Sequence, residues 1–306
     1  MPNGSPTIDT VRVGGPVEAV NIGAPGWRMS VENTQAGISE KARRRQLPSG
    51  AWLDVVAGRA WVEASVPKLL RGVNYPAAPL PDVVEAATMM LEEASGFVRF
   101  SEGDPLVNRL DVVSDLPLED QMTVGTVIST LAALPVMGAQ SVTHHLDPTR
   151  HKAQTLSKRT KSAGSGTLYD KLRESGNEAA RGVLRFEGRE RRRSLRAAGI
   201  ERLSDLDPVL VDLVGRERFK WCGFDTPMLT DQDFWQHLLD ARMYDRTRLQ
   251  VYGFACAQRD LGGISGLFEA RRSDYRWRKF LHEFGVLTKA DQSMRIDYDE
   301  GLVMAA

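Results

Sequence analysis

The sequence predicts an α+β fold, with a mixed, largely antiparallel β-sheet and packed helices in its N-terminal and central parts and a mostly helical C-terminal region. Three observations predict it. Short strand-like segments, separated by turn residues, recur between residues 51 and 189. Two helical patterns interrupt them, and beyond Gly199 the apolar spacing is helical almost throughout. We expect an arm at residues 1–50, a sheet domain at residues 51–200 and a helical domain at residues 201–306.

The first fifty residues carry the weakest pattern. Thr10–Val13 and Val17–Ile22 read as short strands between Gly-Pro turns. The arginine-rich run Lys41–Gln46 is expected to be a loop or the end of a helix. The sequence suggests no role for this part.

The sheet domain begins with the clearest strand pair, residues 51–57 and 59–66, which Gly58 joins as a hairpin. Leu80-Pro81 opens a helix over residues 82–97, because proline favours the first helical turn. The remaining predicted strands are residues 106–113, 141–145, 167–171 and 182–189. The remaining predicted helices are residues 120–134, 203–214, 231–243, 246–261, 264–270 and 275–284.

Composition excludes several classes of protein. The two cysteines, Cys222 and Cys256, are too few for a disulfide framework or a cysteine zinc site, and they fit a reducing cytoplasm. The chain has no continuous apolar run of the kind that a signal peptide or a membrane-spanning helix needs. We therefore expect a cytoplasmic protein with no membrane partner.

Charge points to a partner only through its distribution. With 40 basic and 40 acidic residues the formal net charge is zero, but residues 149–196 are strongly basic. Arginine at this density suits phosphate, although a solvated helix face explains the run at 189–193 equally well. Near Arg276, cations alternate with aromatic residues, which suits base stacking or simply a core. The expected DNA contacts are Arg150, Lys152, Lys158, Arg159, Lys161, Arg189, Arg191, Arg192, Arg193 and Arg276.

Three acidic residues stand inside apolar, strand-like surroundings: Glu63, Asp111 and Glu187. If the face to which they point is buried, each carboxylate must be paired or bind a metal. Three oxygen ligands from separate strands would suit Mg²⁺ or Mn²⁺. The alternative is that each is a solvated residue on the outer face of a half-exposed strand.

Tyr169 follows a Gly/Ser-rich loop within the basic region. A phenol is a weak nucleophile and needs a nearby cation or metal for activation. Lys171, two residues further on, would share its strand face and supply that charge. The alternative is an ordinary strand tyrosine with an exposed hydroxyl.

Several short motifs, in order along the chain, resemble the gene II/X-type replication initiators of filamentous phages. The most specific is Gly182-Val-Leu-Arg-Phe-Glu-Gly-Arg189, followed by a helix end at Gly199-Ile200. It is similar to that family's G-x-x-R-F-E-x-R strand. The other motifs that resemble the family are Val62-Glu63, Pro67-Lys68 to Asn74, Arg109-Leu110-Asp111, Thr167 to Lys171, Arg276-Trp277 and Phe284-Gly285-Val286. Plasmid rolling-circle initiators show a comparable order of signals.

The resemblance implies a DNA-nicking enzyme that starts rolling-circle replication. Residues 51–200 would form the nicking domain and residues 201–306 a DNA-binding or accessory domain. Tyr169 takes the position of the nucleophile and would form a covalent 5′-phosphotyrosine, with Lys171 and Arg185 in the catalytic group. Glu63, Asp111 and Glu187 match acidic positions of metal-site character, so Mg²⁺ or Mn²⁺ is expected.

The implied partners are origin DNA, both supercoiled double-stranded and single-stranded, with host helicase and polymerase as further partners. Two alternatives stay open. One is a non-catalytic regulator that binds the origin of a phage or plasmid without cutting it. The other is a metal-dependent nuclease that uses the same acids with water as the nucleophile, and so leaves no protein on the DNA. The sequence does not determine the oligomeric state.

Overall fold

A computed structural model gives the fold of the chain and confirms the α+β class. It describes residues 6–33, 39–101, 103–118, 121–132, 141–145, 155–159, 164–241, 248–252, 255–256, 286–287, 294–299 and 301–304. The chain forms two compact units. The first comprises residues 1–114, 161–165 and 187–217, and the second comprises residues 115–160, 166–186 and 218–306. The division therefore alternates along the chain.

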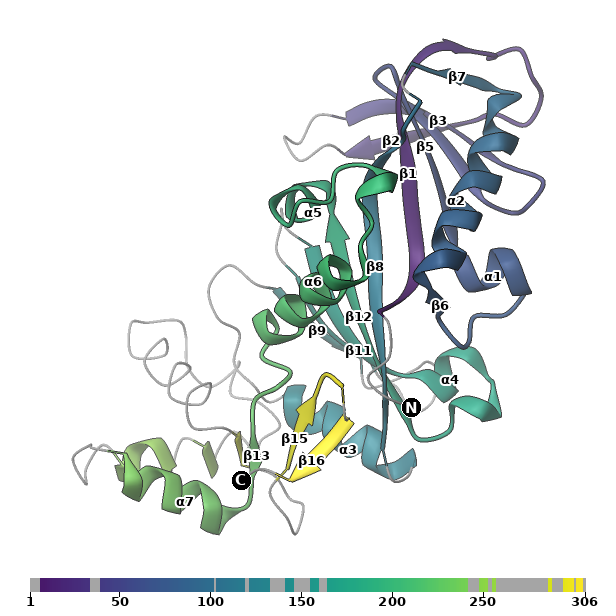
Figure 1. The fold of residues 1–306 in the computed structure, drawn as a ribbon. Coiled ribbons are helices and arrows are strands. Elements are labelled where there is room, and N and C mark those ends of the chain that lie inside the picture. The colour runs from purple at the N-terminus through teal and green to yellow at the C-terminus, as the bar shows by residue number, and fades with distance from the viewer. Residues whose placement is uncertain are drawn as a thin grey trace. The chain divides into compact units, whose positions relative to one another are not determined.

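The first unit is built on antiparallel strands in the order β2-β3-β4-β5-β1-β8-β12, with β6 and β7 also paired to β1 (Figure 1). Its strands are β1 (Thr7–Val20), β2 (Arg28–Asn33), β3 (Ser39–Gln46), β4 (Trp52–Val56), β5 (Arg59–Ser65), β6 (Ala78–Pro79), β7 (Val98–Phe100), β8 (Leu106–Pro117) and β12 (Val183–Arg191). The last two strands contribute residues to both units.

One face of this sheet forms the core of the first unit. The helices of this unit are α1 (Val66–Arg71), α2 (Leu80–Ser95), α5 (Arg192–Ala197), the 3-10 turn η2 (Leu203–Asp205) and most of α6 (Pro208–Trp221). The inward face of α2 carries Val83 and Met90, which are fully buried with strand residues such as Val11 and Leu110. Strand residues alternate between faces, so the residues between these apolar ones lie on the opposite face.

The N-terminal fifty residues form more regular structure than the sequence predicts. The two short strands expected within residues 10–22 are one long strand, β1, which pairs with both β5 and β8. The expectation of a loop or helix end at Lys41–Gln46 is wrong, because this run lies within β3, paired to β2 and β4. Arginine has little intrinsic preference for strands, so pairing with neighbouring strands decides its conformation here.

The second unit has its own core. Its elements are α3 (Gln121–Ala132), β9 (Ser141–His145), β10 (Thr155–Arg159), β11 (Gly164–Asp170), α4 (Lys171–Ser175), η1 (Glu178–Ala180), β13 (Met228–Leu229), α7 (Asp231–Asp240), β14 (Val286–Leu287), β15 (Met294–Asp297) and β16 (Gly301–Met304). Phe186 lies at the centre, edge-to-face with Phe219 at 5.1 Å and with Phe224 at 6.0 Å between ring centroids. Gly166 leaves room for this cluster, since a Cβ there would lie 2.3 Å from Cys222 Sγ.

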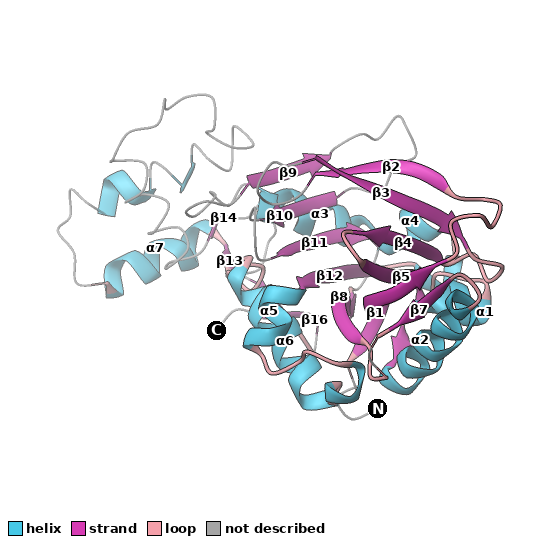
Figure 2. Ribbon diagram, turned by 90° about the horizontal axis from the view of Figure 1, so that it is seen from above, coloured by secondary structure: helices cyan, strands magenta, loops and turns pink. Residues whose placement is uncertain are grey.

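The C-terminal part contains strands that the sequence analysis did not predict. The predicted helix at residues 231–243 is confirmed as α7, but β13, β14, β15 and β16 form a separate four-stranded sheet (Figure 2 labels three of them). The helices predicted at residues 264–270 and 275–284 fall outside the described residues. Within the described part, no helix has the length and apolar character that crossing a membrane requires.

Gly14 gives a direct test of the β1–β5 pairing. Its φ is +154°, and a Cβ at this position would lie 2.0 Å from the carbonyl oxygen of Ala60. We expect Gly14→Ala to destabilise the protein by about 3 kcal/mol, because backbone atoms must move to admit the methyl group. Urea unfolding followed by circular dichroism measures the effect. Gly15→Ala is the matched control, since no atom lies within 4 Å of its Cβ position; equal losses for the two variants would contradict the prediction.

Candidate functional site

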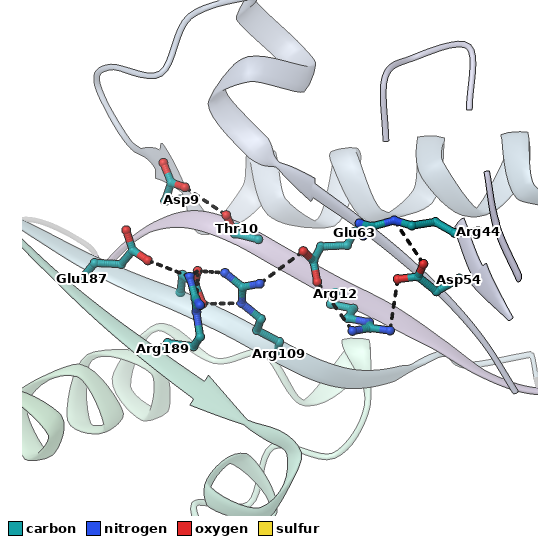
Figure 3. Close-up of polar contacts among 10 residues, drawn as sticks. Asp9, Thr10, Arg12, Arg44, Asp54, Glu63, Arg109, Glu187 and Arg189 are labelled. Atoms are coloured by element: carbon teal, nitrogen blue, oxygen red, sulfur yellow. Dashed lines mark hydrogen bonds and ion pairs between the residues drawn. The ribbon is translucent and has the colours of Figure 1, made fainter. Parts of the chain in front are cut away.

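A chain of ion pairs crosses the first unit on the sheet face opposite the core, and we call it the charged ladder (Figure 3). Its members lie on six adjacent strands and alternate in sign. They are Arg44, Asp54, Arg12, Glu63, Arg109, Asp111, Arg189 and Glu187. Strand register explains the alignment. Arg44 lies directly opposite Asp54 on the neighbouring strand, and Arg12 lies opposite Glu63 on one side and Arg109 on the other.

At the β3 end of the ladder, the ion pairs among Arg44, Asp54, Arg12 and Glu63 have N–O distances of 3.3 to 3.9 Å. Arg44 Nε lies 3.3 Å from Asp54 Oδ1, and Arg12 Nη2 lies 3.3 Å from Asp54 Oδ2. Arg12 Nη1 lies 3.9 Å from Glu63 Oε2, on the side of that carboxylate towards β1. Asp54 is almost fully buried, so its two arginine partners compensate a carboxylate that water does not reach.

Asp111 is the most buried acid of the ladder, with 1% of its surface exposed. Arg109 donates from Nε to Asp111 Oδ1 at 2.7 Å and also from Nη2 to Oδ2. Arg189 Nη2 donates to Asp111 Oδ2 at 3.2 Å and to Glu187 Oε1 at 3.3 Å. Arg109 Nη1 reaches Glu63 Oε1 at 3.2 Å. Two guanidinium groups therefore join the three acids that the sequence analysis selected.

A β-bulge adds a fifth acid, Asp9, to the four of the ladder, and neither Asp9 nor Asp54 was predicted from the sequence. Ile8 pairs with Val112 and Thr10 pairs with Asp111, which leaves Asp9 as the extra residue of β1. A bulge redirects side chains locally. Thr10 Oγ1 donates to Asp9 Oδ2 at 2.9 Å, and the negative charge of Asp9 contributes to raising the pKa of Glu187. An acidic residue between Ile8 and Thr10, next to the strand predicted from Thr10, is the same kind of signal that selected Glu63.

The crowding of acids changes proton affinities. Burial, with the nearby charges of Asp111 and Asp9, raises the pKa of Glu187 to about 7, although Arg189 opposes the shift. Burial by itself would lower the pKa of Arg109, but its hydrogen bond and charge interaction with Asp111, helped by Glu63, raise that pKa above its ordinary value. Arg109 therefore stays charged, whereas Glu187 titrates near neutral pH.

The acids as arranged do not fit a metal ion. Both oxygens of Asp111 accept hydrogen bonds from guanidinium groups, and Glu63 is paired with Arg109 and Arg12. Across the part of the chain that the structure describes, no three His, Cys, Asp or Glu side chains are grouped so that they could hold one ion. The Mg²⁺ or Mn²⁺ requirement therefore stays a prediction.

Tyr169 lies in the second unit, near the end of β11, with 8% of its surface exposed. Lys171 does not share its strand, because Asp170 caps helix α4 by accepting a hydrogen bond from the backbone N–H of Arg173. The lysine is nevertheless close. Its Nζ lies 5.7 Å from the centroid of the Tyr169 ring and 2.6 Å from Glu174 Oε2. The fully buried ammonium thus faces the ring beside a carboxylate partner.

Arg185 is also fully buried in the second unit. Its Nε donates to Asp115 Oδ1 at 2.5 Å and its Nη2 donates to Asp115 Oδ2 at 2.7 Å. This bidentate geometry makes a strong, directional ion pair. The catalytic role predicted for Arg185 is untested, and the contact shown is one that orders β8 and β12.

The residues predicted to contact DNA differ in burial and in their ion pairs. Lys158 is a correction: its side chain is 1% exposed and its Nζ donates to the carbonyl oxygen of Cys222 at 2.6 Å, near the Phe224 ring. Burial lowers the pKa of Lys158 to about 8, and such a lysine does not reach DNA. Arg191 and Arg193 are exposed, as a DNA contact requires.

The remaining predicted contacts are partly paired or not described. Arg192 Nη2 lies 3.5 Å from Glu201 Oε1, and α5 begins only at Arg192, so the preceding run belongs to β12. Arg189 is a member of the charged ladder. The side chains of Arg150, Lys152, Arg159, Lys161 and Arg276 fall outside the described part.

No protein-family model and no curated protein matches the chain. Among solved structures, it is similar to one titled "Structure of Rolling Circle Replication Initiator Protein from Geobacillus stearothermophilus". The similarity has a TM-score of 0.35 at 10% sequence identity, and it covers 94% of this chain and 99% of that chain.

Asp111 should be the least replaceable acid of the ladder. Asp111→Asn removes the charge that balances Arg109 and Arg189, so we expect a loss of about 3 kcal/mol in the free energy of unfolding. Asp82→Asn is the control in the same unit, because Asp82 makes a partly exposed ion pair with Arg71 at 3.6 Å and the variant should cost less than about 1 kcal/mol. Urea unfolding compares the two; similar losses would show that Asp111 is not a buried anchor.

Glu187 should make stability fall as pH rises towards neutrality. Its pKa is about 7 in the folded protein against 4.5 ordinarily, so between these values the folded state holds more protons than the unfolded state. The contribution is fully present below pH 4.5 and is lost as pH rises through about 7, a change of about 3 kcal/mol. Urea unfolding of wild type and Glu187→Gln without divalent cations tests this. Gln should raise stability at pH 8 and not at pH 4.5; parallel pH profiles would refute the shift.

Proposed function

We propose that the protein initiates rolling-circle DNA replication as a site-specific nicking and strand-joining enzyme. The proposal rests on one observation, which combines the sequence motifs with the positions of their acids in the structure. Glu63, Asp111 and Glu187 stand in three separate motifs that resemble phage initiators, and they lie on one face of one sheet, linked by Arg109 and Arg189.

In the proposed reaction the phenolic oxygen of Tyr169 attacks the phosphorus of one phosphodiester. The phosphorus–oxygen bond to the 3′ oxygen breaks, that oxygen takes up a proton and becomes a free 3′-OH, and the 5′ phosphate remains esterified to tyrosine. The ester conserves the energy of the cut bond, so a 3′-OH can later attack it and reseal a strand. Lys171 would stabilise the phenolate through its positive charge.

The arginines of the ladder would act on the DNA backbone. Arg109 and Arg189 are half-buried, fixed in orientation by Asp111, and able to donate to phosphate oxygens. A divalent ion remains part of the proposal because the resemblance implies one. We derive no step from it, since the acids are occupied by guanidinium groups. Comparing nicking with Mg²⁺, with Mn²⁺ and with EDTA tests this requirement.

The proposed partners are supercoiled and single-stranded origin DNA, with host helicase and polymerase acting on the free 3′-OH. One assay separates this proposal from the two alternatives. The protein is incubated with supercoiled plasmid that carries the DNA flanking its gene, and the products are run on a denaturing gel. A covalent protein–DNA adduct supports the initiator. Nicking without an adduct indicates a hydrolytic nuclease, and binding without nicking indicates a regulator.

Tyr169→Phe should abolish the adduct while DNA binding stays within about twofold of wild type, because only the nucleophilic oxygen is removed. Labelled DNA that migrates with the protein on a denaturing gel measures the adduct, and fluorescence anisotropy measures binding. Tyr75→Phe is the control, since it removes a phenolic oxygen from the first unit. Adduct formation by Tyr169→Phe at the wild-type rate would reject Tyr169 as the nucleophile.

A further inference from the structure

The hairpin formed by β2 and β3 extends beyond the rest of the sheet. β3 pairs with β2 from Ser39 to Arg44, but it pairs with β4 only from Arg43 to Gln46. The outer half of the hairpin is thus a ribbon of two strands, and β2 is the edge strand of the first unit (Figures 1 and 2). We call residues 28–33 and 39–46 the edge ribbon.

The base of the edge ribbon carries more positive charge than its surroundings balance. Arg28 is exposed and pairs in register directly with Arg44, while Arg43 lies opposite the exposed Met29. Like charges directly opposite on neighbouring strands are unfavourable. Within the described part of the chain, neither Arg28 nor Arg43 makes an ion pair or a hydrogen bond through its side chain, and Arg44 shares Asp54 with Arg12.

The neighbouring arginine, Arg45, is held by aromatic rings. Its guanidinium lies 3.4 Å from the centroid of Phe97 and 5.5 Å from that of Trp27. Arg44 lies 4.3 Å from the Trp52 ring. Stacking of this kind orders a guanidinium and leaves its edge able to donate hydrogen bonds. Side chains alternate along a strand, so Arg28 and Arg44 lie on one face of the ribbon and Arg43 and Arg45 on the other. The base of the ribbon therefore carries cations on both faces, and the neighbouring strand β4 contributes one carboxylate, Asp54.

We propose that the edge ribbon binds duplex DNA, with Arg28 and Arg43 contacting backbone phosphates on either side of a groove. The inference rests on the proposed function, which makes DNA the substrate. A two-stranded β-ribbon fits the major groove, which is about 12 Å wide. Arginine suits phosphate because its planar group donates two parallel hydrogen bonds and its charge releases counterions. The proposal assigns a role in binding the duplex to the N-terminal fifty residues, for which the sequence predicted none.

A purely structural role is the competing explanation. Cations on an edge strand prevent edge-to-edge association of sheets. The two explanations predict different results when the charge is removed. Loss of edge protection produces oligomers and leaves DNA affinity unchanged, whereas loss of phosphate contacts weakens binding of a protein that keeps its oligomeric state.

The test is the double variant Arg28→Gln/Arg43→Gln in the full chain. Anisotropy titrations use a labelled duplex and a labelled single strand, each about 30 nucleotides long, over a range of salt concentrations. We expect duplex affinity to fall on the order of 10-fold or more at about 0.1 M salt, and the dependence of log K on log salt to become shallower by about 1 to 2. The thermal midpoint should not fall, because the variant removes a like-charge pair.

The control is Arg99→Gln/Arg181→Gln, which removes the same charge from two exposed arginines outside the ribbon, of which Arg181 is paired with Glu178. Equal weakening by the control, unchanged duplex binding by the ribbon variant, or a loss confined to single strands would each overturn the proposal. Size-exclusion chromatography reports the oligomeric state. If the wild type binds neither the duplex nor the single strand, the proposed function itself fails. If the wild type binds DNA and the ribbon variant binds the duplex equally tightly, only the proposal about the ribbon fails.

Discussion

The shared carboxylate of Asp111 is the interaction on which the polar face of the first unit depends. Almost no water reaches it, and it accepts hydrogen bonds from Arg109 and Arg189 on two neighbouring strands. A buried charge is tolerated only when it is paired in good geometry. Pairing one acid with two guanidinium groups also leaves donors free on both arginines. These reach Glu63 on one side and Glu187 on the other, so the ladder continues in both directions.

The opposite sheet face makes this arrangement possible. Residues such as Val11 and Leu110 alternate with ladder residues and pack into the core with α2, which holds the strands in one register. A slip of one residue would exchange the two faces. The bulge at Asp9 is the local exception, and it concentrates a further negative charge near Glu187. The result is a site in which protonation, cation charge and strand register depend on one another.

The chemistry proposed for this protein is divided between its two units. The first supplies the ladder arginines and the edge ribbon, which would hold the DNA backbone. The second supplies Tyr169 with the buried ammonium of Lys171 beside its ring. Basic residues of the sequence have different roles in the folded protein. Lys158 donates a hydrogen bond at a helix end inside an aromatic core, whereas Arg43, in a run with no predicted function, lies in the β2–β3 hairpin.

Local pattern was enough to determine several elements. Strand alternation with a turn at Gly58 predicted the β4–β5 hairpin, and Leu80-Pro81 predicted the start of α2. The apolar surroundings of Glu63, Asp111 and Glu187 predicted that each carboxylate would be paired or bind a metal, and the structure pairs them with Arg109 and Arg189. Their role at a metal site stays a prediction. What the sequence could not determine was which partner. The arginines that bind these acids, the bulge at Asp9, the strand at Lys41–Gln46 and the burial of Lys158 all depend on contacts between segments far apart in the chain. Only the packing and strand register of the folded chain decide such contacts, since local propensity carries no information about which segments lie side by side.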